Sequence, residues 1–314
     1  MTGATPWAIV LAGGEGARLS DLTRDAFGHA VPKQFCRFGS DKSLLARTLE
    51  RARALCAEDR IVPVVAERHR AWWSEELADL PAGRIVSQPE TRGTAVAVLV
   101  ALLKIVVWDG EATVVLLPSD HHVEKESVLE TALRQAVLHA EERAGRVTLL
   151  GMAPEWADTD YGWIEFASAG RREPGYVRRF VEKPDAEEAR RLRARGALWN
   201  SFLMAGSVAA FLGLYREHQP ELWAACVRHL FAPVREREDL IPLYNTLVAR
   251  DFSRDLLQKA EKELRVVRVP ACGWTDLGTP ERLQAWRERQ LAPAAGPALE
   301  PARPRRLAEA VPAF

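Results

Sequence analysis

Short apolar runs alternate with longer helical patterns along most of the chain. The runs are continuously apolar, as in residues 113–117, which is typical of parallel strands buried on both faces. Such strands are predicted over residues 8–12, 61–65, 84–87, 113–117 and 147–150. Helices are predicted between them, over residues 43–56, 70–80, 94–107 and 127–144. This alternation indicates an α/β fold whose sheet is largely parallel.

After residue 160 the pattern changes, because residues 161–166 and 176–181 predict strands separated by a polar turn. We expect this pair to be antiparallel. The rest predicts helices over 185–195, 208–215 and most of 216–262, then a strand over 264–269 and a helix over 280–289. After residue 290 the chain is rich in Ala, Pro and Arg, a composition that buries too little apolar surface to order itself.

The first strand runs directly into a turn that contains Gly13, Gly14 and Gly16. Glycines let the backbone approach a ligand closely and point several N–H groups at one anion. Arg18 and Lys33 would add two positive charges, so the turn predicts a polyphosphate site and a nucleoside triphosphate as ligand. It lacks the Gly-Lys-Ser/Thr ending of the Walker loop and the third glycine of the dinucleotide fingerprint. The alternative is a simple tight corner.

Two aspartates follow strands at positions that suit a cation. Asp120 comes just after the strand over 113–117, and Asp276 lies in a turn after the strand over 264–269. Ligands collect at the carboxyl ends of parallel strands, so Asp120 and Gly13 could share one crevice. Beside a polyphosphate, two carboxylates suit Mg²⁺, a hard cation that prefers oxygen. A helix cap or a surface charge is the alternative for Asp120.

Three further motifs are ambiguous when taken alone. Glu182-Lys183-Pro184 ends a strand and could hold a phosphate through its lysine, or form a surface ion pair of little worth. Tyr161-Gly162-Trp163 and Trp199-Asn200-Ser201 mix aromatic rings with polar groups. Such sets suit a polyol, and they equally suit an ordinary turn.

Composition and charge argue against some classes of binding partner. The 314 residues include 43 Lys and Arg and 43 Asp and Glu, so the net charge is zero, which argues against a nucleic-acid partner. No apolar run is long enough to span a bilayer, and residues 1–7 do not resemble a signal peptide. The four cysteines lack metal-site spacing, so reduced thiols are expected. We expect a cytoplasmic protein with no membrane partner.

Taken in order, the motifs resemble those of the sugar-1-phosphate nucleotidyltransferases, most closely the mannose-1-phosphate guanylyltransferase branch. Pro32-Lys33-Gln34-Phe35 and Trp199-Asn200-Ser201 are characteristic of that branch. The remaining motifs are the stretches 11–19, 88–95, 117–121, 182–184 and 274–278. The resemblance covers roughly residues 7 to 285, and a chance match of so many ordered motifs is improbable.

The resemblance implies a Rossmann-like, mostly parallel but mixed sheet sandwiched by helices, as in nucleotide-diphospho-sugar transferases. It implies an Mg²⁺-dependent enzyme that joins a nucleoside triphosphate, best GTP, to a sugar 1-phosphate, best mannose 1-phosphate, by direct in-line attack. Residues 1–290 would form the catalytic domain, with nucleotide binding in 1–145 and sugar-phosphate binding in 146–290. Residues 291–314 would be a disordered tail, and an isomerase activity is not expected. A homo-oligomer is possible.

The resemblance also assigns roles to individual positions. Catalytic roles fall on Arg18, Lys33 and Asp120. Nucleotide binding falls on Leu11, Ala12, Gly13, Gly14, Gly16, Arg92, Gly93 and Thr94. Sugar-phosphate binding falls on Gly162, Glu182, Lys183 and Asn200, and Mg²⁺ binding on Asp120 and Asp276.

Four positions depart from the family pattern: Ala17, Asp21, Gly93 and Phe202. Gly93 replaces a common Asn in the base segment, and Phe202 stands where a Gly often follows Trp-Asn-Ser. Two other classes stay open. A glycosyltransferase that consumes nucleotide sugars would want an Asp-x-Asp pair, and this chain has Ser119-Asp120-His121. A non-catalytic nucleotide-sugar-binding regulatory protein would be expected to lack Lys33 or a metal carboxylate.

Overall fold

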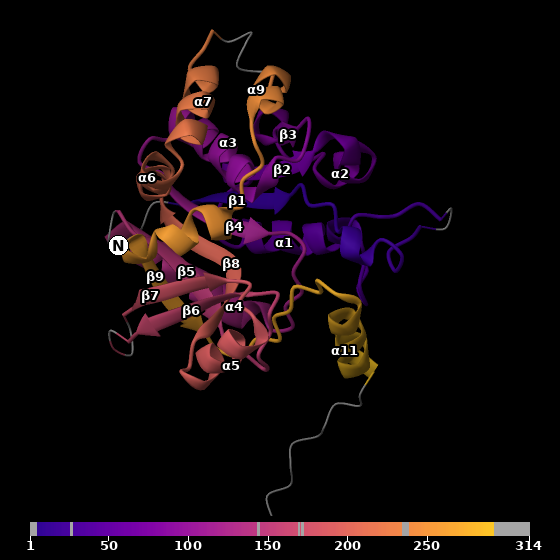
Figure 1. The fold of residues 1–314 in the computed structure, drawn as a ribbon. Coiled ribbons are helices and arrows are strands. Elements are labelled where there is room, and N and C mark those ends of the chain that lie inside the picture. Colours follow the sequence, from indigo (N-terminus) through magenta and orange to yellow (C-terminus); the bar gives the residue numbers. More distant parts are fainter. Residues whose placement is uncertain are drawn as a thin grey trace, which may run out of the picture.

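In the part of the chain that the structure describes, a mixed sheet of nine strands has the order β3-β2-β1-β4-β8-β5-β9-β7-β6 (Figure 1). The computed structural model describes residues 5–25, 28–142, 145–168, 170, 173–233 and 239–291. The strands are β1 (Trp7–Ala12), β2 (Ile61–Ala66), β3 (Val86–Gln88), β4 (Thr113–Pro118), β5 (Val147–Met152), β6 (Gly162–Ala167), β7 (Gly175–Glu182), β8 (Leu198–Ser207) and β9 (Leu264–Val269). The predicted α/β fold with a mixed sheet is confirmed.

The first four strands form a continuous parallel group at one end of the sheet. β1 pairs in parallel with β2 on one side and with β4 on the other, and β2 pairs in parallel with β3. Every residue of β2 and β4 is buried, as their continuous apolar runs predict. The carboxyl ends of these strands therefore lie along one edge.

β8 was not predicted as a strand. It is ten residues long and lies between β4 and β5, antiparallel to both. Trp199-Asn200-Ser201 belongs to it, so the alternative of an ordinary turn at this motif is wrong. A polar Asn and Ser beside an aromatic ring mask the strand pattern, although eight of its ten residues are buried.

The antiparallel excursion of the second half is confirmed. β6 pairs antiparallel with β7, with a register shift between Glu165 and Phe166, and its start also pairs with β8. β7 pairs antiparallel with β9, and β9 returns in parallel beside β5. β7 and β6 thus form an antiparallel edge of the sheet, at the end opposite β3.

Helices cover both faces of the sheet, and successive side chains of a strand point to opposite faces. Ile9 and Leu116 pack in one core cluster with α3 (Gly93–Trp108), α6 (Val208–His218) and α7 (Pro220–Leu230). Val10 and Leu117 pack in a second cluster with helices on the other face. The remaining α-helices are α1 (Leu44–Arg53), α2 (Arg70–Glu76), α4 (Glu126–Glu142), α5 (Ala186–Ala194), α9 (Ile241–Thr246), α10 (Phe252–Asp255) and α11 (Pro280–Leu291).

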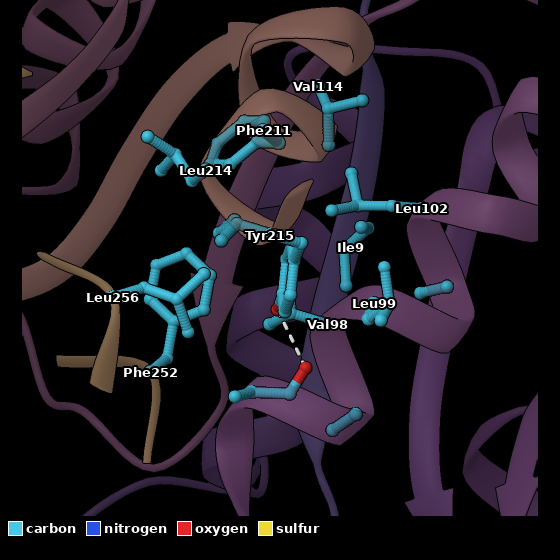
Figure 2. Close-up of a cluster of buried hydrophobic side chains, with 14 of the residues drawn as sticks. Ile9, Val98, Leu99, Leu102, Val114, Phe211, Leu214, Tyr215, Phe252 and Leu256 are labelled. Carbon is cyan, nitrogen blue, oxygen red and sulfur yellow. Dashed lines mark hydrogen bonds between the residues drawn. The ribbon is translucent and has the colours of Figure 1, made fainter. Parts of the chain in front are cut away.

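The first cluster also ties distant segments together through one buried hydroxyl. Tyr215 of α6 lies among Leu99, Phe211 and Phe252, and its OH donates a 2.6 Å hydrogen bond to the carbonyl of Ala95 (Figure 2). Buried polar groups need such partners, and this bond satisfies the tyrosine hydroxyl in the middle of an apolar core. It thereby links α6 to the first turn of α3.

In Figure 1, α11 lies to one side of the sheet, apart from the helices that cover its faces. It packs in a third, small cluster in which Leu283 and Trp286 contact Leu19, Leu44 and Leu277. The segment after β1 and the turn after β9 are thus held against the same helix. The predicted tail falls, beyond Leu291, outside the described residues. Within the part of the chain that the structure describes, no helix is both long and apolar enough to cross a membrane.

Candidate functional site

A cavity of about 320 Å³ opens where β1, β3 and β4 end. Its position matches the expected crevice at the carboxyl ends of the parallel strands. The lining residues are Leu11, Gly13, Gly14, Gly16, Gln34, Val64, Gln88, Thr91, Gly93, Thr94, Ala97, Pro118, Ser119, Asp120, His121 and Phe202. Most of the predicted nucleotide residues, together with Asp120, are therefore brought together around one space.

Two glycines of the glycine turn are closely packed, and at Gly16 the backbone conformation also favours glycine. A Cβ on Gly13 would lie 2.6 Å from Nε2 of Gln88. Gly16 has φ +61°, and a Cβ there would lie 3.0 Å from the backbone nitrogen of Lys33. Only a residue without a side chain gives both the left-handed backbone and the close approach. The turn is thus packed against Lys33 at Gly16, whereas Gly14 and Glu15 are exposed to solvent.

Gln34 fixes the path of the same turn. Its buried amide nitrogen donates to the carbonyls of Ala12, at 3.0 Å, and Gly14, at 2.9 Å. Ser119 joins β4 to β1 in a similar way, because its backbone N–H and its hydroxyl both donate to the carbonyl of Leu11. Because these carbonyls accept hydrogen bonds from Gln34 and Ser119, the turn is held in one conformation at the mouth of the cavity.

Lys33 connects the two aspartates that sequence analysis singled out. Its Nζ lies 2.7 Å from Oδ2 of Asp120 and donates a 2.5 Å hydrogen bond to the backbone carbonyl of Asp276. The lysine side chain is only 7% exposed, whereas that of Asp120 is 41% exposed. Burial alone would raise the pKa of Asp120, but Lys33 and His121 outweigh it and lower the pKa. Asp120 is therefore a carboxylate that faces the cavity.

The carboxylate of Asp276 is held by several donors. Oδ1 accepts hydrogen bonds from the Tyr161 hydroxyl, at 2.7 Å, and from the Gly278 N–H, at 3.0 Å. Arg282 of α11 donates from one nitrogen to both carboxylate oxygens, each at 3.1 Å. Burial and the nearby charge of Asp276 raise the pKa of the Tyr161 hydroxyl, so it stays protonated as a donor.

Arg282 extends this contact into a network of charges. Its second terminal nitrogen lies 2.6 Å from Oδ1 of Asp158 and 3.5 Å from Oδ2 of Asp160. Asp160 in turn pairs with Arg18 of the glycine turn at 3.3 Å. Arg18, a predicted catalytic residue, thus contacts a carboxylate across the site, and its side chain is 58% exposed.

One wall of the cavity comes from the start of α3. Gly93 has φ +81°, and a Cβ there would lie 2.2 Å from the carbonyl of Arg250. Thr94 accepts, at its Oγ1, a hydrogen bond from the N–H of Phe252, whose ring meets Phe202 edge-on with centroids 5.6 Å apart. Phe202 therefore closes the wall between α3 and β8.

Two predicted nucleotide residues do not line this cavity. Ala12 is buried in the second core cluster, and only its carbonyl takes part in the turn. The Arg92 guanidinium donates to the carbonyl of Tyr244 and pairs with Glu90 at 2.8 Å. Their nucleotide-binding roles stay predictions.

The predicted sugar-binding residues meet beside β8. Gly162 and Glu182 are directly opposite in the β6–β7 ladder. A Cβ on Gly162 would lie 2.6 Å from Oε2 of Glu182 and 3.2 Å from Cβ of Asn200. The Asn200 Oδ1 accepts from the N–H of Phe202, which links this cluster to the cavity wall. Lys183 is next to the cluster, with its Nζ 4.0 Å from Oε1 of Glu182.

Strained backbone is concentrated at this site. Among the described residues, the non-glycine residues with positive φ are Lys183 (49°), Phe202 (60°) and Leu277 (47°). Each lies within two residues of a position that the sequence resemblance places in the site. Such conformations cost of order 1–3 kcal/mol each and persist where the surroundings require them, often at functional sites. Phe202 thus has the left-handed φ that favours glycine, at the position where the family often has Gly.

Several site residues were missed from the sequence. Gln34 and Gln88 lie within the quoted motifs, but nothing in the sequence shows that a glutamine is buried and bonded to the backbone of a binding turn. Phe202 was noted as a departure and not as a wall of the cavity. Tyr161 and Arg282 hold Asp276 from distant segments, which only the folded chain brings together. Within the described residues, no cluster of three or more His, Cys, Asp or Glu could hold a metal ion.

The chain is similar to known proteins over most of its length. The family model described as nucleotidyl transferase matches residues 7–291. The alginate biosynthesis protein AlgA of Pseudomonas syringae is 32% identical over 86% of this chain and 56% of its own. Mannose-1-phosphate guanylyltransferase 2 of Escherichia coli O157:H7 is 30% identical over 90% of this chain and 60% of its own. The chain thus spans little more than half the length of these curated relatives.

A solved structure agrees in fold. A protein of Thermus thermophilus, described as a mannose-1-phosphate geranyltransferase, is 29% identical with a TM-score of 0.74, covering 87% of this chain and 76% of its own. The family model spans the glycine turn, both predicted metal carboxylates and the sugar cluster alike. The chain belongs to the nucleotidyl transferase family.

Proposed function

We propose that this protein transfers the guanylyl group of GTP to mannose 1-phosphate, giving GDP-mannose and pyrophosphate. The proposal rests mainly on the position of Phe202, which lies between the cavity and the predicted sugar-binding residues. Phe202 lines the cavity of the glycine turn, and its N–H donates a hydrogen bond to Oδ1 of Asn200. A nucleotide in the cavity and a sugar phosphate beside Glu182 would then meet near Asp120. The choice of guanine and mannose rests on the names of the relatives.

The chemistry needs no general base from the protein. An oxygen of the sugar phosphate attacks the α-phosphorus of the triphosphate, and a new P–O bond forms there. The P–O bond to the β-phosphate breaks, and its electron pair leaves with pyrophosphate. A phosphate dianion is already a nucleophile, so the residues act by positioning and by neutralising charge. Lys33 and Arg18 are cations beside the glycine turn and would stabilise the departing pyrophosphate.

Asp120 and Asp276 fit the role of Mg²⁺ ligands. Asp120 presents its carboxylate to the cavity, and Lys33 contacts both that carboxylate and the backbone carbonyl of Asp276. Mg²⁺ is usually bound by one or two carboxylates together with substrate phosphates. When bound, it would supply Lewis-acid charge neutralisation at the phosphate oxygens. His121 would not be a ligand in this arrangement, because its Nδ1 accepts a hydrogen bond from Trp274 and the neutral ring then carries its proton on Nε2.

Glu182 would contact the sugar hydroxyls in a poorly solvated place. Its side chain is 9% exposed. Burial, followed by the negative charge of Asp251, raises the pKa of Glu182 from 4.5 to about 7. Near neutral pH this carboxyl therefore exists in both protonation states, and it can either donate or accept a hydrogen bond.

The experiment that tests the proposed function is a pyrophosphate-release assay with Mg²⁺. GTP, UTP, ATP, dTTP and CTP are each paired with mannose 1-phosphate and with glucose 1-phosphate. We expect release with GTP and mannose 1-phosphate. Release with another pair alone would contradict the assigned specificity and keep the transfer. No release with any pair, while nucleotide still binds, would instead favour a regulatory binding protein.

Lys33→Ala is expected to lower kcat roughly 10²–10³-fold, the usual loss for one preorganised charge in an active site. The lost Nζ contacts both aspartate segments. Steady-state kinetics measures the change in kcat, and the melting temperature of each variant shows whether it is folded. Lys42→Ala, which removes an exposed lysine paired with Glu50, is the matched control and should leave kcat unchanged. A Lys33→Ala protein with near-normal kcat would remove this lysine from the mechanism.

Glu182→Gln is expected to stabilise the protein at neutral pH. The folded-state pKa of about 7 lies above the ordinary 4.5, so ionisation of Glu182 opposes folding as pH rises through this window. The stability gain of the variant over the wild type should be absent below pH 4.5 and grow to about 3 kcal/mol at most by pH 8. Urea unfolding at several pH values measures it.

The matched control for this series is Glu187→Gln, since the Glu187 side chain is 67% exposed on α5. It should show no comparable growth with pH. A Glu182→Gln gain that is equal at pH 4 and pH 8 would contradict a raised pKa at this position.

A further inference from the structure

Arg282 contacts three carboxylates of the site at once. One terminal nitrogen, Nη1, lies 3.1 Å from both oxygens of Asp276. The other, Nη2, lies 2.6 Å from Asp158 and 3.5 Å from Asp160. Its guanidinium also covers the ring of Tyr161, with Cζ 4.1 Å from the ring centroid. Arg282 is therefore anchored on several sides.

The two ends of the guanidinium are unequal. The contact of Arg282 with Asp158 is the shorter one, and the side chains of these two residues are each only 8% exposed. Asp276 is 18% exposed and already has Tyr161 and Gly278 as additional donors. Arginine cannot lose its proton in a protein, so it gives up a carboxylate only by moving or by sharing it with another cation. The Nη1 end is the one that can be released while Arg282 stays paired.

We propose that Arg282 is a placeholder cation for Asp276. Nη1 balances and orients this carboxylate until a divalent cation arrives, and then yields it, while Nη2 stays on Asp158. The inference rests on the proposed function, in which Asp276 is a ligand of Mg²⁺. It assigns Arg282 a positioning role that is coupled to metal binding, although the residue belongs to α11, outside the helices that cover the sheet.

A placeholder and a simple support predict opposite effects on metal affinity. If Arg282 competes with the metal for Asp276, removing it raises the affinity of the site for a divalent cation. If Arg282 only holds Asp276 in a binding conformation, removing it lowers that affinity. A charge-assisted hydrogen bond is strong enough for an effect of about tenfold in either direction.

The experiment titrates Mn²⁺ alone into the full chain and follows the free ion by electron paramagnetic resonance. We expect Arg282→Gln and Arg282→Lys both to bind Mn²⁺ about tenfold more tightly than the wild type. Arg282→Lys guards against loss of the fold, because its single ammonium can remain on the buried Asp158. Arg289→Gln is the matched control, since Arg289 lies on the same helix and pairs with Glu155 at 3.3 Å. Its affinity should equal that of the wild type.

A second variant ties the gain to Asp276. Adding Asp276→Asn to Arg282→Lys should remove the gain in Mn²⁺ affinity. Weaker Mn²⁺ binding by folded Arg282→Lys would overturn the placeholder role, even if pyrophosphate release by the wild type is intact. Absence of Mn²⁺ binding in the wild type would overturn both this inference and the metal site of the proposed function.

Discussion

The two contacts of the buried Lys33 ammonium hold the separate segments of the site together. The ammonium joins the carboxylate of Asp120, just after β4, to the backbone carbonyl of Asp276, in the turn after β9. A buried lysine charge is tolerated only when it is paired and hydrogen-bonded, and both requirements are met here. The backbone of the same lysine packs against Gly16 of the glycine turn. Three segments far apart in the chain are therefore held around one lysine.

This arrangement explains how a protein with zero net charge could bind highly charged substrates. The cations Lys33, Arg18 and Arg282 are each paired with an aspartate, so the charges are balanced locally. Polyphosphate would enter by replacing carboxylates as the partners of Lys33 and Arg18. The strained residues at the edges of the site are consistent with a shape that is set by the fold before ligands bind.

Much of the fold was predictable, because buried parallel strands leave continuous apolar runs such as residues 113–117. β8 was not, because its Trp199-Asn200-Ser201 start breaks that pattern although the strand is central. In the site, Gly13 and Asp120 were predictable from their places after strands. The partners of Asp276 were not, because Tyr161 and Arg282 meet it only through tertiary packing.

In the proposed reaction both substrates bind side by side and react directly, with no nucleotide bound covalently to the protein. The most direct test is the exchange of labelled pyrophosphate into GTP. In the absence of mannose 1-phosphate and GDP-mannose, we expect no exchange. Adding GDP-mannose should produce labelled GTP as the reaction runs in reverse. Exchange with GTP and pyrophosphate alone would require a covalent nucleotidyl-protein intermediate and would contradict direct transfer.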